Sequence, residues 1–457
     1  MMKPIVDRHI SKMIVPFQYS GNYHSAIERM DTGWWKVPEQ CNRENLFSHI
    51  DYLIADTVDS QREGTIGRRF ELTKEGYKSV NLPANISSKW ITINKKGQTF
   101  RIKLKCVNLY LFETNVGFIT FDLEHPKGIL IDEYILANNT MKNLKPQSGT
   151  TLDIYMGDKA ERIPFTFSKL VQDLAGPMES VTYFDNIGDQ PIQGIVFNAV
   201  ILDSEGQCPN DMKRYLFELR RAFKPSYQPS PVEFKIEENE EIYQAFENSF
   251  WGVSLEGAAN LVYLKNNQET DTFFQGNYLH NIKTTYFYLF MLTLHQRYSL
   301  LYINGIAAKL PRNEAGNGKT VTSIRDRMIF FTLRSAFQHV STITHQNKLY
   351  DVFQSTLQVD RMMDELHFEL ETLEQMAELK KTKERNRMDD YLVNISSIFV
   401  FISTISAIWT MLIPILNGDH PAVGTNDFYI MISVYGVVCI IGFVMYLFVL
   451  RKLNLNK

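Results

Sequence analysis

Two long apolar runs near the C-terminal end constrain this chain more than any other feature. The first is YLVNISSIFVFISTISAIWTMLIPIL at residues 391–416, and the second is FYIMISVYGVVCIIGFVMYLFVL at residues 428–450. Neither run contains a charged side chain. Because an α-helix rises about 1.5 Å per residue, roughly 20 apolar residues cross the ~30 Å of hydrocarbon in a bilayer. The sequence therefore predicts a two-helix transmembrane hairpin with an outer loop at residues 417–427.

Positive charge flanks the two outer ends of the predicted hairpin and is absent from the loop that connects its helices. The basic residues before the first helix and after the second are Lys380, Lys381, Lys383, Arg385, Arg387, Arg451, Lys452 and Lys457. The loop NGDHPAVGTND contains no Lys or Arg. Because short loops rich in Lys and Arg stay in the cytosol, we expect both termini to be cytoplasmic and residues 451–457 to form a basic cytosolic tail. The N-terminal MMKPIVDRHISKMIVPF lacks the apolar core of a signal peptide, so we expect a multi-pass protein of the cell inner (plasma) membrane.

Residues 1–345 are predicted to fold as a cytosolic α+β (α/β) sensor domain. Polar and apolar residues alternate in TFRIKLKCVNLYLF, and VGFITFDLEHP follows a turn that contains Asn115 and Gly117, a pattern typical of a β-hairpin. The segment PNDMKRYLFELRRAF instead places its apolar residues on one helical face. The prolines of KPSYQPSP, at residues 224–231, indicate a connector and a subdivision of the domain.

Composition argues against two classes of partner. A formal net charge of -3 provides no basic field for nucleic acid. The cysteines at positions 41, 106, 208 and 439 form no CxxC pair and stand at no metal-finger spacing from histidine. We therefore expect no direct contact with nucleic acid and no structural metal.

A heptad pattern precedes the first membrane helix. Apolar side chains recur at helical spacing at Val352, Val359, Met363, Leu366, Leu370, Leu373 and Ala377. Thr356 is the one polar member, and no Pro or Gly occurs between Leu349 and Ile413 to predict a helix break. A helix of about 65 residues is roughly 100 Å long. The sequence predicts a very long stalk helix at residues 346–390 that continues without interruption into the membrane helix at residues 391–416.

Hydroxyl side chains form a stripe along the first membrane helix, which turns by about 100° per residue. The residues on or near this stripe are Ser396, Phe399, Ser403, Ser406, Thr410 and Asn417. Ser397 and Thr404 share a second, narrower face. The stripe has two interpretations: a helix–helix contact, or the lining of a water-filled pore shared among subunits. The uninterrupted stalk favours the pore, because it would link the soluble domain mechanically to the bilayer.

No catalytic constellation is present in the sequence. NEAGNGKT ends like a P-loop at residues 318–320, but Asn313 replaces the first glycine that such a loop requires. There is no GxSxG elbow and no HExxH motif. His295 could line a site beside Arg297, although a core histidine is the better interpretation. We therefore predict that the protein is not an enzyme and has no catalytic residues.

Two pairs of adjacent arginines are the candidate ligand-binding residues. Arg68 and Arg69 follow Gly67, and Arg220 and Arg221 end the predicted amphipathic helix. Guanidinium groups bind phosphate or carboxylate through paired hydrogen bonds, so either pair could hold an anionic ligand. The alternative is that each pair belongs to an ordinary solvated surface.

In the order and length of its parts, the sequence resembles the CorA superfamily. The matching parts are a large cytosolic domain, a stalk helix that continues as the first membrane helix, a short outer loop, a second membrane helix and a basic tail. The resemblance implies a homo-oligomer, a homopentamer in that family, in which the first membrane helices line a pore. The matching pore-lining positions are Ser396, Ser403, Ser406 and Thr410. CorA magnesium transporters end this helix with Gly-Met-Asn, whereas this chain has Ile415, Leu416 and Asn417, so the resemblance does not extend to magnesium selectivity.

The segment VNLYLFETNVGFITFDLE and the dipeptide Trp251-Gly252 are similar to CorA-like membrane proteins associated with type III CRISPR systems. This resemblance implies an antiviral defence effector, in which a nucleotide second messenger binds the cytosolic domain and opens an ion channel. In that family the messenger is a conjugate of S-adenosylmethionine with AMP (SAM-AMP). Two other functions stay open: a divalent cation (Mg or Co) transporter of CorA type, and a membrane-anchored scaffold or enzyme with a non-conducting hairpin.

Overall fold

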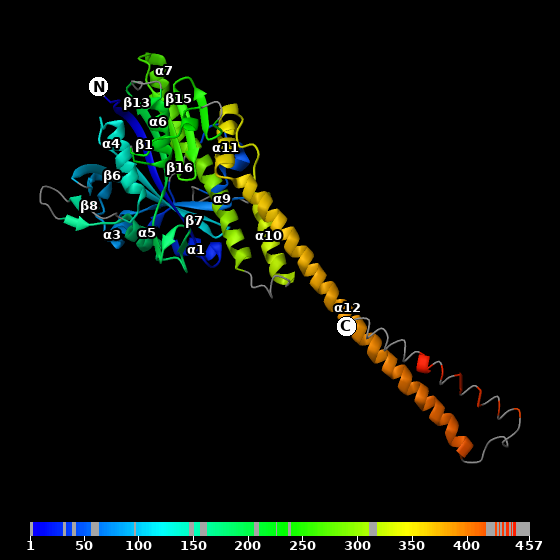
Figure 1. Cartoon of the computed structure of the whole chain (residues 1–457). Helices are drawn as coiled ribbons and strands as arrows, with labels where there is room; N and C mark the ends of the chain where they lie inside the picture. The colour runs from blue at the N-terminus through cyan, green and yellow to red at the C-terminus, as the bar shows by residue number, and fades with distance from the viewer. Residues whose placement is uncertain are drawn as a thin grey trace. The chain divides into compact units, whose positions relative to one another are not determined.

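The computed structural model divides into two compact units (Figure 1). The first unit comprises Met1–Leu310 and Thr322–Leu370, and the second comprises Pro311–Val321 and Glu371–Lys457. The structure describes residues 3–30, 33–38, 43–55, 64–95, 97–145, 150–155, 162–204, 210–224, 226–235, 239–309 and 318–416, with isolated positions between 426 and 444. A mixed helix and sheet region is followed by one long apolar helix, as the sequence predicts for the layout of the chain. Residues on both sides of the connector at 224–231 belong to the first unit.

The first unit is built on a large twisted sheet. Its strands are β1 (Val6–Gln18), β2 (Trp35–Lys36), β3 (Ile54–Ala55), β4 (Gly67–Leu72), β5 (Ile91–Lys95), β6 (Gln98–Phe112), β7 (Val116–Glu124), β8 (Thr150–Tyr155), β9 (Arg162–Pro164), β10 (Thr182–Tyr183), β13 (Ile195–Leu202), β14 (Ile242–Phe246), β15 (Ser249–Ser254) and β16 (Gly257–Tyr263). The main path runs β14-β15-β16-β13-β1-β7-β6-β5-β8-β9, and β4 pairs with β6 beside β5. A separate pair is formed by β11 (Asn186–Ile187) and β12 (Gln190–Pro191).

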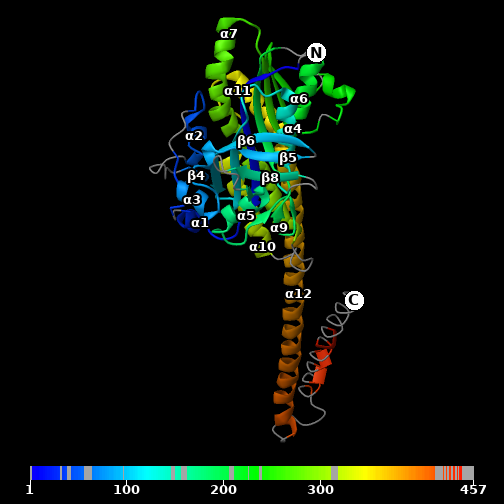
Figure 2. The same ribbon diagram turned by 90° about the vertical axis from the view of Figure 1, so that its left-hand side faces the viewer.

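Helices lie on both faces of this sheet (Figure 2). The described helical segments are α1 (Tyr23–Met30), α2 (Ser48–Asp51), α3 (Lys74–Ser79), η1 (Ile86–Ser88), α4 (Ile131–Lys142), α5 (Phe167–Ala175), α6 (Asp211–Arg221), η2 (Pro231–Phe234), α7 (Gln268–Phe273), η4 (Phe274–Tyr278), α8 (Leu279–Asn281), η5 (Ile282–Tyr286), α9 (Phe287–Ala308), α10 (Gly318–Ser335), α11 (Thr344–Thr356) and α12 (Val359–Leu416). The predicted β-hairpin is confirmed as β6 and β7, which pair antiparallel around a turn where Asn115 has a φ of 65°. The predicted amphipathic helix is α6.

The strand β13 shows why the sheet is apolar on both faces. Every residue of β13 is buried, and adjacent residues point to opposite faces. On one face the Phe197 ring lies 5.4 Å from the ring of Phe290 in α9. On the other face Val200 shares a hydrophobic core with residues of α4 and α6. Strands covered on both faces carry nearly continuous apolar runs rather than an alternating pattern.

The predicted uninterrupted stalk is wrong at one point, because α11 ends at Thr356 and α12 begins at Val359. Gln358 between them has a φ of 58°, a left-handed conformation that costs a non-glycine residue about 1–2 kcal/mol. Leu357 is 0% exposed and Val359 is 3% exposed, so the break buries apolar residues on both of its sides. Arg297 of α9 also donates a hydrogen bond to the carbonyl oxygen of Leu357. Tertiary packing therefore outweighs helix continuity here.

The first turns of α12 belong to the core of the first unit. Val359, Leu366 and Leu370 are buried in the same hydrophobic core as the inner residues of α9 and α10. Met363 packs against that core, and Leu373 is only partly covered. The first part of the predicted heptad seam is therefore an intramolecular contact within the first unit.

Candidate functional site

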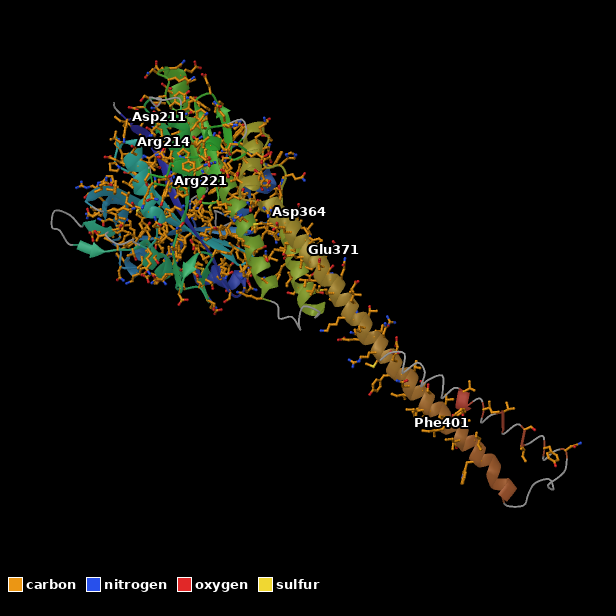
Figure 3. All side chains as sticks on the ribbon, in the orientation of Figure 1. Asp211, Arg214, Arg221, Asp364, Glu371 and Phe401 are labelled. Atoms are coloured by element: carbon orange, nitrogen blue, oxygen red, sulfur yellow. The ribbon has the colours of Figure 1, made fainter. Side chains whose placement is uncertain are left out.

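The second half of α12 exposes apolar side chains along its whole length. Ile398 is 58% exposed, Ile402 is 56% exposed and Trp409 is 64% exposed. Figure 3 shows Phe401 on the same part of the helix. Among the described residues, α12 is the one helix long and apolar enough to cross a membrane, and none of its most apolar stretch is buried. Because a large exposed apolar surface is unfavourable in water, this half of α12 indicates association with a membrane.

The rest of the predicted hairpin lies mostly outside the described residues. Only scattered positions of the predicted second membrane helix at 428–450 are described, and the outer loop at 417–427 and the tail at 451–457 are almost entirely outside. Asn417, the outermost candidate pore residue, is also outside the described residues. Multi-pass topology, and with it the cytoplasmic placement of both termini, stays a prediction.

The apolar half of α12 has two distinct faces. The partly covered residues are Asn394, Ser397, Thr404 and Ile408. The exposed candidate pore residues are Ser396, Phe399, Ser403, Ser406 and Thr410. At about 100° per residue, the centres of these faces lie roughly 150° apart. A Cβ placed on Gly442 would lie 3.7 Å from Thr404 Cγ2, so the covered face meets a later segment of the same unit. The predicted stripe lies in the part of the helix that is left exposed, together with apolar residues such as Ile398 and Ile402.

The hydroxyl groups of both faces bond to the helix itself. Ser403 Oγ donates to the carbonyl oxygen of Val400 at 2.9 Å, and Thr410 Oγ1 donates to that of Ser406 at 2.8 Å. On the covered face, Thr404 Oγ1 donates to Val400 at 2.7 Å. Because such bonds satisfy a hydroxyl without water, the hydrogen bonds do not separate a pore lining from a helix contact. Exposure is what distinguishes the two faces.

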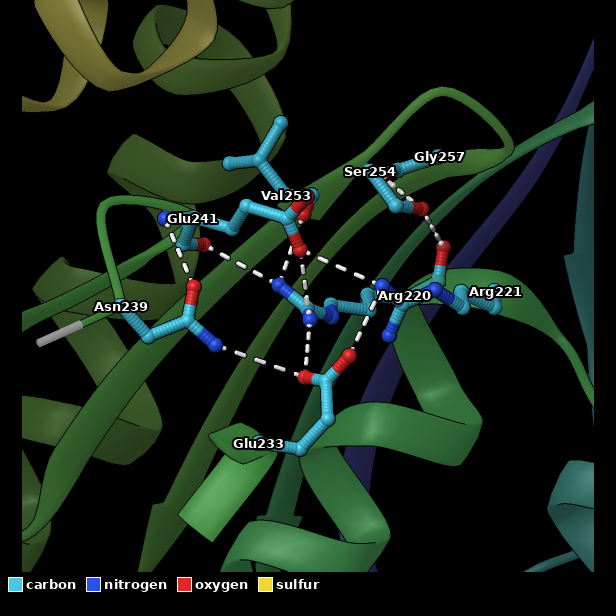
Figure 4. A network of polar contacts seen from close by, with 8 residues as sticks. All are labelled: Arg220, Arg221, Glu233, Asn239, Glu241, Val253, Ser254 and Gly257. Carbon is cyan, nitrogen blue, oxygen red and sulfur yellow. Dashed lines mark hydrogen bonds and ion pairs between the residues drawn. The ribbon is translucent and has the colours of Figure 1, made fainter. Parts of the chain in front are cut away.

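The arginine pair at the end of α6 is a structural ion cluster (Figure 4). Arg220 is 0% exposed, and its Nη2 lies 2.5 Å from Glu233 Oε2 and 2.8 Å from Glu241 Oε2. Arg221 Nη2 lies 3.0 Å from Glu233 Oε1 and 3.2 Å from Glu241 Oε2. Arg220 Nη1 also donates to the carbonyl oxygen of Val253 at 2.8 Å. Since two carboxylates neutralise the two guanidinium groups and Arg220 is inaccessible, this pair is not a free anion site.

Gly252 makes room for this cluster. A Cβ at Gly252 would lie 2.9 Å from Arg220 Cδ and 2.9 Å from Leu216 Cγ, which is closer than carbon atoms pack. The neighbouring Trp251 is buried, and its Nε1 donates to the hydroxyl of Tyr278 at 3.1 Å. The Trp251-Gly252 dipeptide therefore has a packing role in this chain.

The other arginine pair is divided between the two faces of β4. Arg69 Nε and Nη2 donate to Asn108 Oδ1 at 3.1 and 3.0 Å. Arg68 points to the face of Phe70, with its guanidinium carbon 5.5 Å from that ring centroid. Arg68 makes no ion pair within the described residues, and its buried Nε has no hydrogen-bond partner there. Of the four candidate arginines, Arg68 is therefore the one that makes no ion pair and no side-chain hydrogen bond within the described residues.

The part of the chain that the structure describes contains no candidate metal centre. No group of three or more His, Cys, Asp or Glu side chains among the described residues could hold a metal ion. His295 Nε2 lies 3.0 Å from Thr114 Oγ1, and its ring stacks on Phe112 at 4.0 Å. Burial lowers the pKa of His295 to about 3, so it is a neutral core histidine. Gly318 begins α10, so Gly318, Lys319 and Thr320 of NEAGNGKT belong to this helix, and the rest of the motif lies outside the described residues.

Comparisons with known proteins give one weak likeness. No protein-family model and no curated protein matches the chain. Among solved structures, the chain is similar to the CorA magnesium transporter from Methanocaldococcus jannaschii at 12% identity, over 58% of this chain and 93% of that chain. The TM-score of 0.16 does not establish a common fold. The proposed function must therefore be argued from the residues of this chain and not from this likeness.

Proposed function

We propose that this chain is the subunit of a homo-oligomeric membrane channel, in which the second half of α12 lines a pore. The observation that carries the proposal is the difference in exposure between two faces of α12. One face, at Ser397 and Thr404, is partly covered by its own unit, whereas the stripe at Ser403 and Ser406 is exposed. A channel subunit needs such an open polar stripe on an otherwise apolar membrane helix, because copies of it then surround a water-filled path.

The same helix offers a route from ligand binding to gating. Leu366 and Leu370 anchor the start of α12 in the core of the first unit, and the helix continues to Leu416. A ligand opens such a channel only by binding the open state more tightly than the closed state. Moving the ratio of open to closed from 1:99 to 99:1 takes about 5.5 kcal/mol of differential affinity, which several sites in one ring can share.

We propose a nucleotide second messenger as the ligand, with the first unit as its receptor and no catalysis by the protein. The resemblance to CorA-like effectors of type III CRISPR systems supports the SAM-AMP conjugate as that messenger and antiviral defence as the role. It also supports a homopentamer in the inner membrane. Because Ile415 and Leu416 replace the Gly-Met of magnesium transporters, the proposed pore is not specific for magnesium.

Ion flux from liposomes tests this function. The full chain would be reconstituted in vesicles of phosphatidylethanolamine and phosphatidylglycerol, with magnesium-sensitive and monovalent-sensitive dyes, with and without SAM-AMP. We expect flux that depends on the messenger. Magnesium uptake that ignores the messenger would indicate a CorA-type transporter instead, and no flux of either kind would indicate an anchored scaffold or enzyme.

A further inference from the structure

A group of basic and aromatic side chains surrounds the tip of the β6–β7 hairpin in the first unit. The backbone N–H of Glu113 donates to the carbonyl oxygen of Ile66 at 2.9 Å, which places the hairpin beside the start of β4. Asn115 Nδ2 donates to the carbonyl oxygen of Gly21 at 2.9 Å, which brings in the chain just before α1. Figures 1 and 2 both place α1 and α10 at this end of the first unit.

Arg334, in the last turn of α10, contacts the hairpin tip and the chain just before β4. Its Nη1 lies 2.9 Å from Glu113 Oε2, and its Nη2 donates to the carbonyl oxygen of Thr65 at 2.8 Å. Arg68 comes from the next part of β4, where its buried Nε has no partner within the described residues. Arg334 therefore faces the Glu113 carboxylate, and Arg68 adds a second guanidinium group that makes no ion pair within the described residues.

Tyr23 of α1 comes two residues after Gly21, whose carbonyl oxygen accepts the hydrogen bond from Asn115 at the hairpin tip. Burial raises the pKa of the Tyr23 hydroxyl, Glu113 raises it further, and Arg68 and Arg334 lower it. All three charged groups therefore act on the same phenol. The hydroxyl stays protonated at neutral pH and provides a further hydrogen-bond donor to an anion.

Phe330 adds an aromatic surface beside Arg334. Its side chain is 41% exposed, and the guanidinium carbon of Arg334 lies 5.0 Å from its ring centroid. Exposed aromatic rings beside arginine are the groups that stack on nucleobases, while guanidinium groups bind phosphate. We propose that Arg68, Arg334, Tyr23 and Phe330, here called the hairpin-tip site, bind a nucleoside phosphate.

This proposal rests on the proposed function, because it assigns the hairpin-tip site to the ligand that gates the channel. A different face of α10 gives the connection. Ile324, Met328 and Phe331 of α10 are buried in the same core as Leu366 and Leu370 of α12. A ligand that contacts Arg334 and Phe330 would therefore shift a helix whose inner face shares a core with the start of α12.

The experiment measures binding of AMP and SAM-AMP to the full chain in phosphatidylcholine nanodiscs by isothermal titration calorimetry. The loss of a charge-assisted contact predicts that Arg68→Gln weakens both ligands by about 10- to 100-fold. Arg69→Gln is the matched control, because it removes the neighbouring guanidinium from the other face of β4 and should leave both affinities unchanged. Phe330→Ala, at an exposed position, should weaken AMP but not inorganic phosphate.

The outcomes separate this proposal from the channel itself. Binding that Arg68→Gln weakens, with no flux in liposomes, would support the hairpin-tip site and overturn the channel. Messenger-gated flux with the same half-maximal concentration in wild type and Arg68→Gln would keep the channel and overturn the site. Equal binding by Arg68→Gln and Arg69→Gln, or no binding of AMP and SAM-AMP to the wild type, would also overturn it. Thermal unfolding of each variant confirms that it is folded.

Discussion

The two ends of α12 meet opposite surroundings within one helix. At its start, Leu366 is 2% exposed and Leu370 is 5% exposed, because both belong to the core of the first unit. Further along, Ile402 is 56% exposed and Trp409 is 64% exposed. The start carries apolar residues at helical spacing among charged ones, whereas the later half has no charged side chain and is apolar except for its hydroxyl and amide residues. A periodic stripe therefore indicates contact with protein, and a continuous apolar surface indicates contact with lipid.

Charged residues show the same contrast between buried and exposed surroundings. The first unit buries Arg220 completely and surrounds it with Glu233 and Glu241. The charged middle of α12, including Arg387, is exposed to solvent. A buried charge is tolerated only with partners, whereas an exposed charge needs none. Changes in the covered part should therefore alter stability, and changes in the uncovered part should alter function.

The largest expected effect is the loss of a buried charge. Arg220→Ala should reduce the free energy of unfolding by roughly 3–5 kcal/mol, because it leaves the carboxylates of Glu233 and Glu241 without their buried partner. Arg387→Ala on the exposed part of α12 is the comparison and should change it little. Denaturant unfolding followed by tryptophan fluorescence measures both. Equal free energies of unfolding for the two variants would contradict the contrast between buried and exposed charge.

Truncation of an apolar side chain should be costly in the buried part of α12 and not in its exposed part. The loss of stability should be similar to that of Arg220→Ala or smaller. Leu366→Ala should destabilise the first unit by roughly 2–5 kcal/mol, since it opens a cavity in a packed core. Ile402→Ala removes a comparable side chain from an exposed position and should leave the unfolding of that unit unchanged. Thermal unfolding in detergent would compare them, and a large loss for Ile402→Ala would mean that protein covers this part of the helix.

A buried carboxyl in the first unit predicts a pH dependence. Glu218 is 1% exposed, and neither carboxyl oxygen has a hydrogen-bond partner within the described residues. Burial raises its pKa to about 7, Arg214 lowers it and Asp132 raises it. The unfolded chain ionises near the usual value of 4.5, so Glu218 costs stability increasingly as the pH rises from about 4.5 to about 7.

Glu218→Gln removes this titration. We expect the variant to gain up to about 3 kcal/mol on the wild type at pH 8, whereas the difference should be much smaller at pH 4, where both side chains are neutral. Denaturant midpoints at the two pH values measure the change. A difference that does not vary with pH would contradict a buried carboxyl with a raised pKa.

Local patterns in the sequence predict the elements whose contacts are local. Alternation and the turn at Asn115 predict the β6–β7 hairpin, and helical spacing predicts α6 and the stripe of Ser403 and Ser406. The break at Gln358 has no local signal, because it depends on the burial of Leu357 and on a hydrogen bond from Arg297. The sequence alone therefore overestimates the length of the stalk helix.

The arginine pairs show that sequence patterns do not identify partners that are distant in the chain. Arg220 and Arg221 look like a surface pair because their partners, Glu233 and Glu241, follow the proline-rich connector. The role of Arg334 beside Glu113 has no signal in the sequence, since the two residues are distant in the chain. Strand alternation, in contrast, is enough to predict that Arg68 and Arg69 point to opposite faces once β4 is recognised.

Thiol accessibility tests the central claim, that the exposed stripe of α12 lines a water-filled path. Ser403→Cys on the exposed stripe and Ser397→Cys on the partly covered face would be made in a background without the native cysteines. Each would be reconstituted and treated with a charged, membrane-impermeant thiol reagent during messenger-gated flux. We predict that modification blocks flux through Ser403→Cys and leaves Ser397→Cys unaffected. Equal inhibition of both variants, or block through Ser397→Cys alone, would contradict the assignment of the pore.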